Sequence, residues 1–260
     1  MTQVLRSRWW VSPLLALQFL TRIPVSALNG VPGAEIAHGL KRSPIWFPLV
    51  GTLIGCLTAS VLILADLLWP RIIAVLVALA IEARLTGAFH EDAVADFCDA
   101  LGGGYDRKST LRILKDSRIG SYGTVGLILA IGLRAALLMT IPTSLLPWAV
   151  IASACFGRLL AVATMSFIPQ PQEIEGIASQ VRSSTQWPIL LMASLLALPA
   201  LLPLALTRPL ELIAAIVGSA LFLIWLYRLL LNRLGGATGD CLGFAAYAGQ
   251  LILLLAIATE

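Results

Sequence analysis

Long apolar runs, separated by short polar or proline-containing breaks, make up most of the chain. Seven of these runs reach the roughly 20 residues that one crossing of a lipid bilayer requires. We therefore predict an all-α fold, a polytopic bundle of about seven transmembrane helices, at 45–69, 72–89, 123–141, 148–168, 188–206, 210–231 and 243–259. Proline and glycine between the runs mark loops and not domain borders. Residues 1–260 are thus expected to form a single integral-membrane domain.

The apolar run at 9–28 differs from the other seven. It begins with Trp9 and Trp10, and Thr21-Arg-Ile-Pro24 interrupts it early. Because no small-residue cleavage site of a signal peptide follows it, we expect an interfacial or re-entrant helix with both tryptophans at headgroup depth. A full first span is the alternative. A polar connection is expected at 30–44.

The composition supports a membrane protein and excludes several other classes. Hydrophobic residues make up 58% of the chain and charged residues only 12%, with a mean hydropathy of +0.90, whereas soluble domains carry roughly 25% charged residues. No basic patch is interleaved with exposed aromatic residues, so nucleic acid is not an expected partner. The four cysteines are scattered and are expected to be free thiols. Two histidines are too few for a His-rich zinc or copper site.

The basic residues predict which side of the membrane each connection occupies, because cytoplasmic loops are enriched in Lys and Arg. If 9–28 does not cross, one face keeps only Arg71 and Arg208. The opposite face collects thirteen basic residues: Arg6, Arg8, Arg22, Lys41, Arg42, Arg107, Lys108, Arg112, Lys115, Arg118, Arg182, Arg228 and Arg233. We therefore predict a multi-pass protein of the cell (inner) membrane with its longer connections facing the cytoplasm. Those connections are 90–122, 169–187 and 232–242.

Three aspartates directly follow the second predicted span. Asp92, Asp96 and Asp99 are spaced i, i+4, i+7, so on a helix they share one face within an arc of about 60°. No Lys or Arg lies between Asp92 and Asp99, and like charges at this spacing repel by about 0.2–0.5 kcal/mol per pair. Carboxylates without His or Cys partners favour a hard cation, Mg²⁺ or Mn²⁺. We predict that these three aspartates bind a divalent cation, Mg²⁺ or Mn²⁺.

A basic helix is expected after the glycines at 102–104, with Asp106 as its N-cap. Lys108, Arg112 and Lys115 repeat the spacing of the aspartates with the opposite charge. An acidic and a basic stripe that face one space suit a diphosphate, because Mg²⁺ bridges its oxygens while Lys and Arg neutralise the rest. The alternative is that the two stripes pair with each other in a salt-bridge seam.

Two other segments offer groups for a phosphate-bearing substrate. Ser117-Arg-Ile-Gly-Ser-Tyr-Gly123 supplies the Ser117 hydroxyl, the Arg118 guanidinium and two glycines that allow close approach of the backbone to a ligand. The glycine-rich stretch at 234–243 supplies backbone N–H groups together with Thr238 and Asp240. It lacks the Lys of a P-loop, and an ordinary flexible connection is the alternative.

Ionisable residues inside a membrane span usually face a cavity or the bundle interior and are functional hypotheses by default. Arg134 and Arg158 lie on neighbouring predicted spans, and for each the choice is between substrate contact and an internal ion pair. Glu82 and Arg84 are expected either to pair with each other or to extend their charged ends to the membrane surface. His90 precedes Asp92 by two residues, with a structural and a substrate-binding role equally open.

Four segments resemble motifs of the cobalamin synthase (adenosylcobinamide-GDP ribazoletransferase) family. The stretch Thr86-Gly-Ala-Phe-His-Glu-Asp-Ala-Val-Ala-Asp-Phe-Cys-Asp is similar to its His-x-Asp-Gly-x-x-Asp-x-x-Asp-Gly segment, and Lys115-Asp-Ser-Arg-Ile-Gly to its (Arg/Lys)-Asp-Ser-Arg-x-Gly segment. Gly235-Gly-Ala-Thr-Gly-Asp resembles its Gly-Gly-x-Thr-Gly-Asp segment, and Phe19-Leu-Thr-Arg-Ile-Pro-Val its opening motif. The chain departs from the family at four positions: Ala93 and Ala100 replace glycine, and Tyr247 and Gln250 stand where many relatives carry carboxylates.

The resemblance implies the last step of nucleotide-loop assembly in vitamin B12 (cobalamin) biosynthesis. Adenosylcobinamide-GDP and α-ribazole, or its 5′-phosphate, give adenosylcobalamin, or its phosphate, and GMP. Mg²⁺ bound by Asp92, Asp96 and Asp99 is implied, with Asp96 as the candidate base. The implied substrate-binding residues are His90, Lys115, Ser117, Arg118, Arg158, Thr238 and Asp240.

Two other functions and the assembly state remain open on the sequence. The first alternative is a CDP-alcohol phosphotransferase-like enzyme that makes a lipid, although Val94-Ala-Asp96 lacks the Arg of that motif. The second is a secondary transporter that uses Glu82, Arg134 and Arg158, although transport sites tend to lie near the midplane between repeats. A homo-oligomer is open as well.

Overall fold

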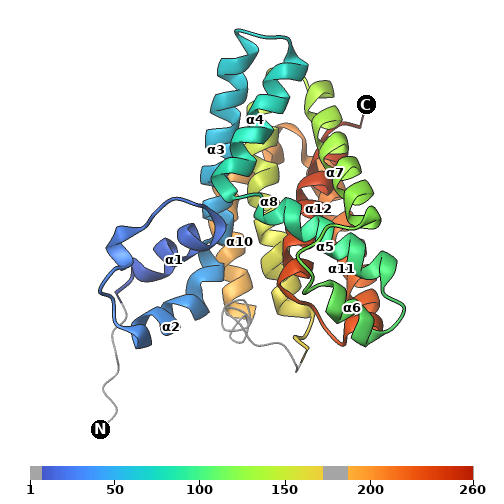
Figure 1. Ribbon diagram of the computed structural model, residues 1–260. Coiled ribbons are helices and arrows are strands. Elements are labelled where there is room, and N and C mark those ends of the chain that lie inside the picture. Colours follow the sequence, from blue (N-terminus) through green and yellow to red (C-terminus); the bar gives the residue numbers. More distant parts are fainter. Residues whose placement is uncertain (1–7, 172–186, 260) are drawn as a thin grey trace.

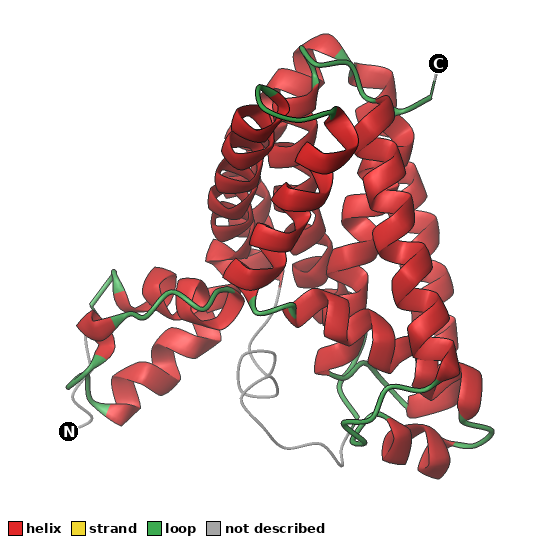
Figure 2. Ribbon diagram, turned by 45° about the horizontal axis from the view of Figure 1, so that its top comes forward, coloured by secondary structure: helices red, strands yellow, loops and turns green. Residues whose placement is uncertain are grey.

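The computed structural model describes residues 8–171 and 187–259, and the regular elements in these ranges are all helices (Figures 1 and 2). The predicted spans correspond to α3 (Phe47–Asp66), α4 (Arg71–Thr86), α7 (Ser121–Thr140), α8 (Leu146–Phe167), α10 (Trp187–Thr207), α11 (Pro209–Leu234) and α12 (Gly239–Ile257). In the described ranges six helices are long and apolar enough to cross a membrane, and α4, with 16 residues, is the remaining predicted span. The predicted helical membrane bundle is confirmed.

The break after α4 creates the helix that carries the aspartates. Gly87 and Ala88 both have positive φ, 74° and 55°, a conformation that reverses the chain direction and is costly for any residue with a Cβ. As a result α5 (Phe89–Gly103) turns by 88° away from α4. We therefore treat α5 as part of the polar connection and not as the continuation of a span.

Helix α8 lies at the centre of the bundle and packs on α3, α10 and α12. Glycines allow these close crossings: a Cβ at Gly55 would meet the backbone of α8 at Ile151, and one at Gly157 would meet the backbone of α12 at Ala246. Small residues at helix crossings are how helices pack closely in membranes, where no hydrophobic effect drives them together.

The N-terminal region forms a separate small unit beside one end of the bundle (Figure 1). Helix α1 (Val11–Leu20) has 10 residues and is therefore about 15 Å long, too short for a full span. The predicted interfacial or re-entrant helix is compatible with this length, and the alternative of a full first span is not. The polar connection at 30–44 is not irregular, because α2 (Gly33–Arg42) occupies most of it. The Arg8 backbone N–H donates to Glu35 at 2.7 Å and holds α2 in place.

The connections segregate to opposite ends of the bundle. At one end Arg71, the first residue of α4, donates to Thr143 in the turn between α7 and α8 at 2.8 Å. At the other end lie α1, α2, α5 and α6 (Arg107–Ile113) (Figure 1). Two short 3-10 helices, Ser26–Leu28 and Ser43–Trp46, complete the N-terminal unit. The middle of the predicted 169–187 connection, Arg182 included, and Arg6 lie outside the described residues.

Candidate functional site

Helix α5 carries the three aspartates in three different environments. The helix confirms that Asp92, Asp96 and Asp99 occur at helical spacing on one element. Asp92 is exposed, Asp96 is half-buried and Asp99 is buried, with 8% of its surface exposed. Their burial increases along α5 toward its C-terminus, so the three carboxylates are not equivalent.

Asp99 holds the start of α7. Its carboxylate accepts hydrogen bonds from the backbone N–H groups of Gly120 at 2.6 Å and Gly123 at 2.8 Å. These N–H groups have no partner within the helix, and an anion at a helix N-terminus also interacts favourably with its dipole. A Cβ at either glycine would overlap the Asp99 carboxylate. From the sequence we expected these glycines to let a ligand approach the backbone. In the structure they instead leave room for the Asp99 carboxylate.

Asp96 lies among other carboxylates. Burial raises the pKa of Asp96 to about 6, and repulsion by Asp92, Asp240 and Asp99 contributes to the rise. Asp240 comes from the first turn of α12, about 140 residues further along the chain. The fold thus brings Asp240, from the glycine-rich segment at 234–243, close to Asp96 of α5. This is what we expected if the two segments contribute to one site.

The donor set of this cluster suits a hard divalent cation. Asp92, Asp96, Asp99 and Asp240 offer only carboxylate oxygens, the ligands that Mg²⁺ prefers, and a bound cation would relieve their mutual repulsion. Within 8–171 and 187–259, however, no three His, Cys, Asp or Glu side chains are close enough to hold one metal ion together in this conformation. The residues fit Mg²⁺ by their chemistry, and the structure leaves the metal to be tested.

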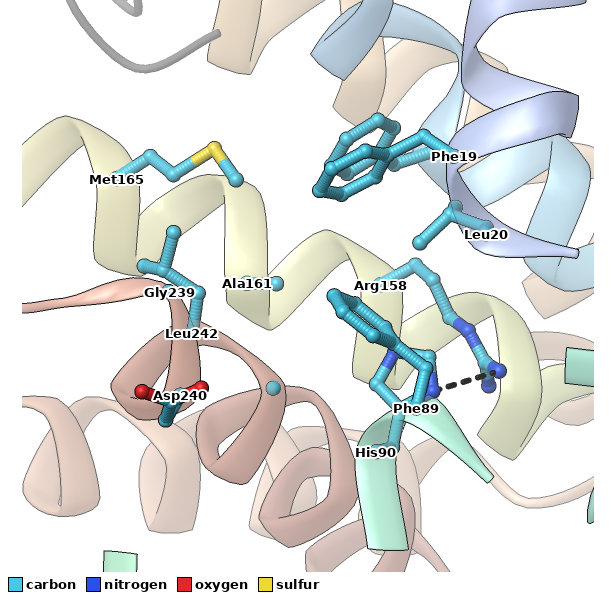
Figure 3. A pocket seen from close by; sticks show the side chains of 12 residues that line it. Phe19, Leu20, Phe89, His90, Arg158, Ala161, Met165, Gly239, Asp240 and Leu242 are labelled. Atoms are coloured by element: carbon cyan, nitrogen blue, oxygen red, sulfur yellow. Dashed lines mark hydrogen bonds between the residues drawn. The ribbon is translucent and has the colours of Figure 1, made fainter. Parts of the chain in front are cut away.

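A cavity of about 210 Å³ lies beside the carboxylates, enclosed by α1, α3, α5, α8 and α12. Figure 3 shows Phe19 and Phe89 on one side of it, Arg158 and His90 together, and Asp240 on the α12 side. His90, Arg158 and Asp240 were predicted from separate parts of the sequence, and the structure brings all three to one cavity. Asp240 belongs to both the cavity and the carboxylate cluster, so the two adjoin.

The two buried arginines of neighbouring spans have different partners. Arg134 donates to Glu82 at 2.7 Å, and Thr58 donates to the same carboxylate at 3.0 Å. Arg158 lies 3.5 Å from His90 Nδ1 and donates to the Ala154 carbonyl at 3.3 Å. The Nε atoms of both arginines lack a hydrogen-bond partner. What distinguishes Arg158 is that no described carboxylate lies within ion-pair distance of it, although Glu82 and Glu91 interact with it electrostatically over a longer distance. Arg134 therefore forms an internal ion pair with Glu82, and Arg158 is the one of the two arginines that is available to an anion.

The basic segment after α5 does not form the predicted stripe. Helix α6 ends at Ile113, so Lys115 lies in the following turn, off the helix that carries Lys108 and Arg112. Asp106 caps α6 as predicted, in a reciprocal pair of hydrogen bonds with Ser109. No ion pair among the described residues joins these three cations to the aspartates of α5, so the salt-bridge seam is not formed.

Of the remaining candidates of this segment, Arg118 lines a second, open pocket at the C-terminal end of α5. Its lining includes Asp99, Asp116, Arg118, Gly120 and Tyr122. Arg118 is exposed and pairs with Asp116 at 2.7 Å. Lys115 and Ser117 lie close to Arg118 in the sequence. Both side chains are exposed, and neither residue lines either pocket.

The glycine-rich segment is an ordered helix start and not a flexible connection. Gly235, with a φ of 74°, ends α11, and Thr238 caps α12 by accepting the Cys241 N–H at 3.5 Å. Thr238 is buried and its hydroxyl caps the helix, whereas Asp240, in the first turn of α12, lines the cavity.

Sequence reasoning missed two contributions to the site. Phe19 and Phe89 line the cavity and contact each other edge to face with ring centroids 5.5 Å apart. Arg233, at the end of α11, donates to the Leu101 carbonyl at 3.3 Å and to the Gly104 carbonyl, which fixes the end of α5. The first contribution had a signal in the sequence, since Phe19 begins the segment at 19–25 that resembles a family motif. The carbonyl contacts of Arg233 had none.

Comparison with known proteins gives a consistent result. A family model described as cobalamin-5-phosphate synthase matches residues 12–258. Among similar proteins named adenosylcobinamide-GDP ribazoletransferase, that of Leptothrix cholodnii is 37% identical, over 91% of this chain and 93% of its own. That of Ralstonia pickettii is 36% identical over 94% of both chains, and that of Leptospira biflexa 33% identical over 88% of both. No solved structure matches the chain.

Proposed function

The chain belongs to the cobalamin-5-phosphate synthase family, and from this premise we propose that it joins adenosylcobinamide-GDP to α-ribazole or its 5′-phosphate. The products are adenosylcobalamin, or its phosphate, and GMP. The names of the relatives support the coarser statement, a transferase of cobalamin synthesis. The phosphoryl-transfer chemistry, the metal and the residue roles given below are proposals.

One observation supports this proposal more than any other. Segments from four distant parts of the chain meet at one end of the bundle and place the carboxylates of Asp92, Asp96 and Asp240 beside a cavity that holds the unpaired Arg158. Opposed groups of this kind, carboxylates for a cation and a buried guanidinium for an anion, are what a diphosphate donor requires.

In the proposed reaction the ribazole hydroxyl attacks the phosphorus that carries the cobinamide arm. The bond between this phosphorus and the bridging oxygen of the diphosphate breaks, and GMP leaves with that oxygen. Asp96 takes the proton of the attacking hydroxyl. Arg118 and Lys115 stabilise charge on the transferring group when the exposed loop at 115–120 closes on the donor. Holding both substrates in line is itself a large part of catalysis.

Mg²⁺ is the proposed cofactor, with Asp92, Asp96 and Asp99 as the residues that hold it. When bound, it neutralises charge on the diphosphate oxygens. Asp99 takes part through lone pairs not used by the N–H groups of Gly120 and Gly123. His90, Ser117, Arg158, Thr238 and Asp240 are the proposed substrate-binding residues. Because Thr238 caps α12, its contribution is to hold Asp240 and the helix N-terminus in place.

The proposed location is the cell (inner) membrane with the active-site end facing the cytoplasm. The distribution of basic residues supports this orientation, because Arg71 and Arg208 are the basic residues at the opposite end. No observation specifically supports either of the two alternative functions. Glu82 and Arg134 pair with each other, which leaves a transport pathway without its proposed charges, and the family assignment disfavours the lipid enzyme.

The experiment that tests the proposal uses purified full-length protein in lipid nanodiscs. It is incubated with adenosylcobinamide-GDP, α-ribazole and Mg²⁺, and GMP and the cobalamin product are measured together. We expect equal amounts of both products, loss of turnover when EDTA replaces Mg²⁺, and recovery when Mg²⁺ is restored. Absence of both products from folded protein would rule out the proposed reaction, and turnover in EDTA would rule out the metal alone.

A further inference from the structure

An open groove of about 520 Å³ lies between the cytoplasmic parts of α8 and α11. It shares no lining residue with the two pockets of the candidate site. Its α11 residues recur at helical spacing, so they form one face of that helix. The lining consists of Phe167 of α8 and of Ala220, Leu223, Ile224, Tyr227 and Arg228 of α11.

The groove opens into the lipid bilayer, because α8 and α11 are both membrane spans and its walls are exposed. Phe167 has 46% of its surface exposed and Ile224 has 51%. An empty groove at this place would deprive its walls of dispersion contacts on one side, and most of its lining is apolar, which does not favour water. An acyl chain is the molecule that the surrounding bilayer supplies to such a groove.

The polar end of the groove lies at the depth of the lipid headgroups. Arg208 precedes α11 at the opposite end of the bundle, and Arg228 follows it by twenty positions. A helix rises about 30 Å over that distance, which equals the thickness of the hydrocarbon core. Trp187 is 68% exposed and contacts Phe167 edge to face at 5.1 Å. Together with Tyr227 it forms the aromatic rim that is typical of a membrane interface.

Arg228 is an exposed cation that has no partner in the part of the chain that the structure describes. No hydrogen bond or ion pair joins its side chain to another residue of 8–171 or 187–259. Arg208, by contrast, pairs with Glu211 at 3.0 Å. A guanidinium binds a phosphate well. Because no carboxylate lines the groove, nothing there would hold the ammonium group of a zwitterionic headgroup.

We propose that this groove is a binding site for one anionic phospholipid. The headgroup phosphate accepts hydrogen bonds from Arg228, and one acyl chain follows α11 past Ile224 and Leu223 toward Ala220. Basic residues between spans on the cytoplasmic side recognise anionic headgroups in this way. The proposal is independent of the proposed reaction, because no residue of the groove belongs to the carboxylate cluster or to the cavity beside it.

The test is native mass spectrometry of the full-length protein in detergent, titrated separately with phosphatidylglycerol and phosphatidylcholine. The dissociation constant of the first bound lipid is measured, and we expect phosphatidylglycerol to bind more tightly. Arg228→Gln should weaken phosphatidylglycerol binding about fivefold, as for loss of one basic residue at the membrane surface, and Arg228→Lys should retain most of it. Ala220→Phe fills the groove without changing its charge and should weaken the binding of both lipids.

Two matched controls are placed on the same helix. Arg208→Gln removes an arginine that already has a carboxylate partner, and Leu221→Phe enlarges a residue that is 63% exposed and does not line the groove. Neither should change the binding of the first lipid. Equal affinity of wild-type protein for the two lipids, or wild-type affinity in both Arg228→Gln and Ala220→Phe, would overturn the proposal. A dimer that Ala220→Phe separates would also overturn it, because the groove would then be an interface between two copies of the chain.

Discussion

Near the start of α5, Arg158 of α8 lines a cavity and has no carboxylate within ion-pair distance among the described residues, whereas at the end of α5 Asp99 has both carboxylate oxygens hydrogen-bonded to backbone N–H groups. Arg158 Nε and the cavity beside it are open to a ligand. Asp99, by contrast, accepts hydrogen bonds from Gly120 and Gly123 and keeps only its remaining lone pairs for the proposed metal ion. One end of the helix therefore borders a site that is open to a ligand, and the other end fixes the start of α7.

This difference shows how a buried charge can be interpreted. Burying an ion without a partner is expensive, so a fold that keeps one unpaired usually does so for a ligand. An ion whose partners are all internal needs no such explanation. The contrast separates residues that should control turnover from residues that should control stability.

The largest expected effect lies between the two ends, at Asp96. Asp96→Asn keeps the shape of the side chain but removes its charge and its capacity to take a proton. We expect GMP release to fall by at least about a hundredfold, with the thermal midpoint of unfolding unchanged. The matched control is Asp66→Asn, because Asp66 pairs with Arg71 at the opposite end of the bundle. Near-normal turnover of Asp96→Asn would place the chemistry elsewhere.

The two buried arginines give the next largest effect and a direct contrast. Arg158→Gln should lower kcat/KM by about tenfold to a hundredfold, the loss of one charged hydrogen-bond contact to an anion, with little loss of stability. Arg134→Gln leaves Glu82 as a buried carboxylate without its cation, which costs about 3–5 kcal/mol. It should therefore lower the thermal midpoint strongly.

Turnover and unfolding of both arginine variants are to be measured on the same nanodisc preparations. If Arg158→Gln proves the less stable variant and Arg134→Gln the less active one, the assignment of the two arginines is reversed.

The smallest expected effect tests the structural joint at the end of α5. In Gly123→Ala the new Cβ displaces the Asp99 carboxylate from α7, and we expect a loss of about 1–3 kcal/mol in the free energy of unfolding. Gly132→Ala on the same helix is the matched control, because no atom lies within 4 Å of a Cβ added there. It should be neutral or stabilising by up to about 1 kcal/mol. Equal unfolding midpoints for both alanine variants would show that Asp99 does not hold α7.

The sequence predicted the membrane bundle because the bilayer imposes rules that can be checked along the chain. The length of each apolar run sets the number of spans, and the spans at 123–141 and 148–168 correspond to α7 and α8 within a few residues. Helical spacing likewise placed the three aspartates on one element. The α2 helix at 33–42 was missed although its polar and apolar residues recur at helical spacing, and the contact of Arg8 with Glu35 that holds it in place is not local.

By itself, then, the sequence determined the helical class, the number of spans, the family motifs and the clustering of polar residues at one end. Only the tertiary structure decided that Arg134 and not Arg158 forms an ion pair. It also showed that Gly120 and Gly123 leave room for the Asp99 carboxylate, and that Phe19 and Phe89 line one cavity. The physical reason is distance along the chain. Arg134 meets Glu82 across 52 residues and Arg158 meets His90 across 68, and local spacing carries no information about which helix faces which.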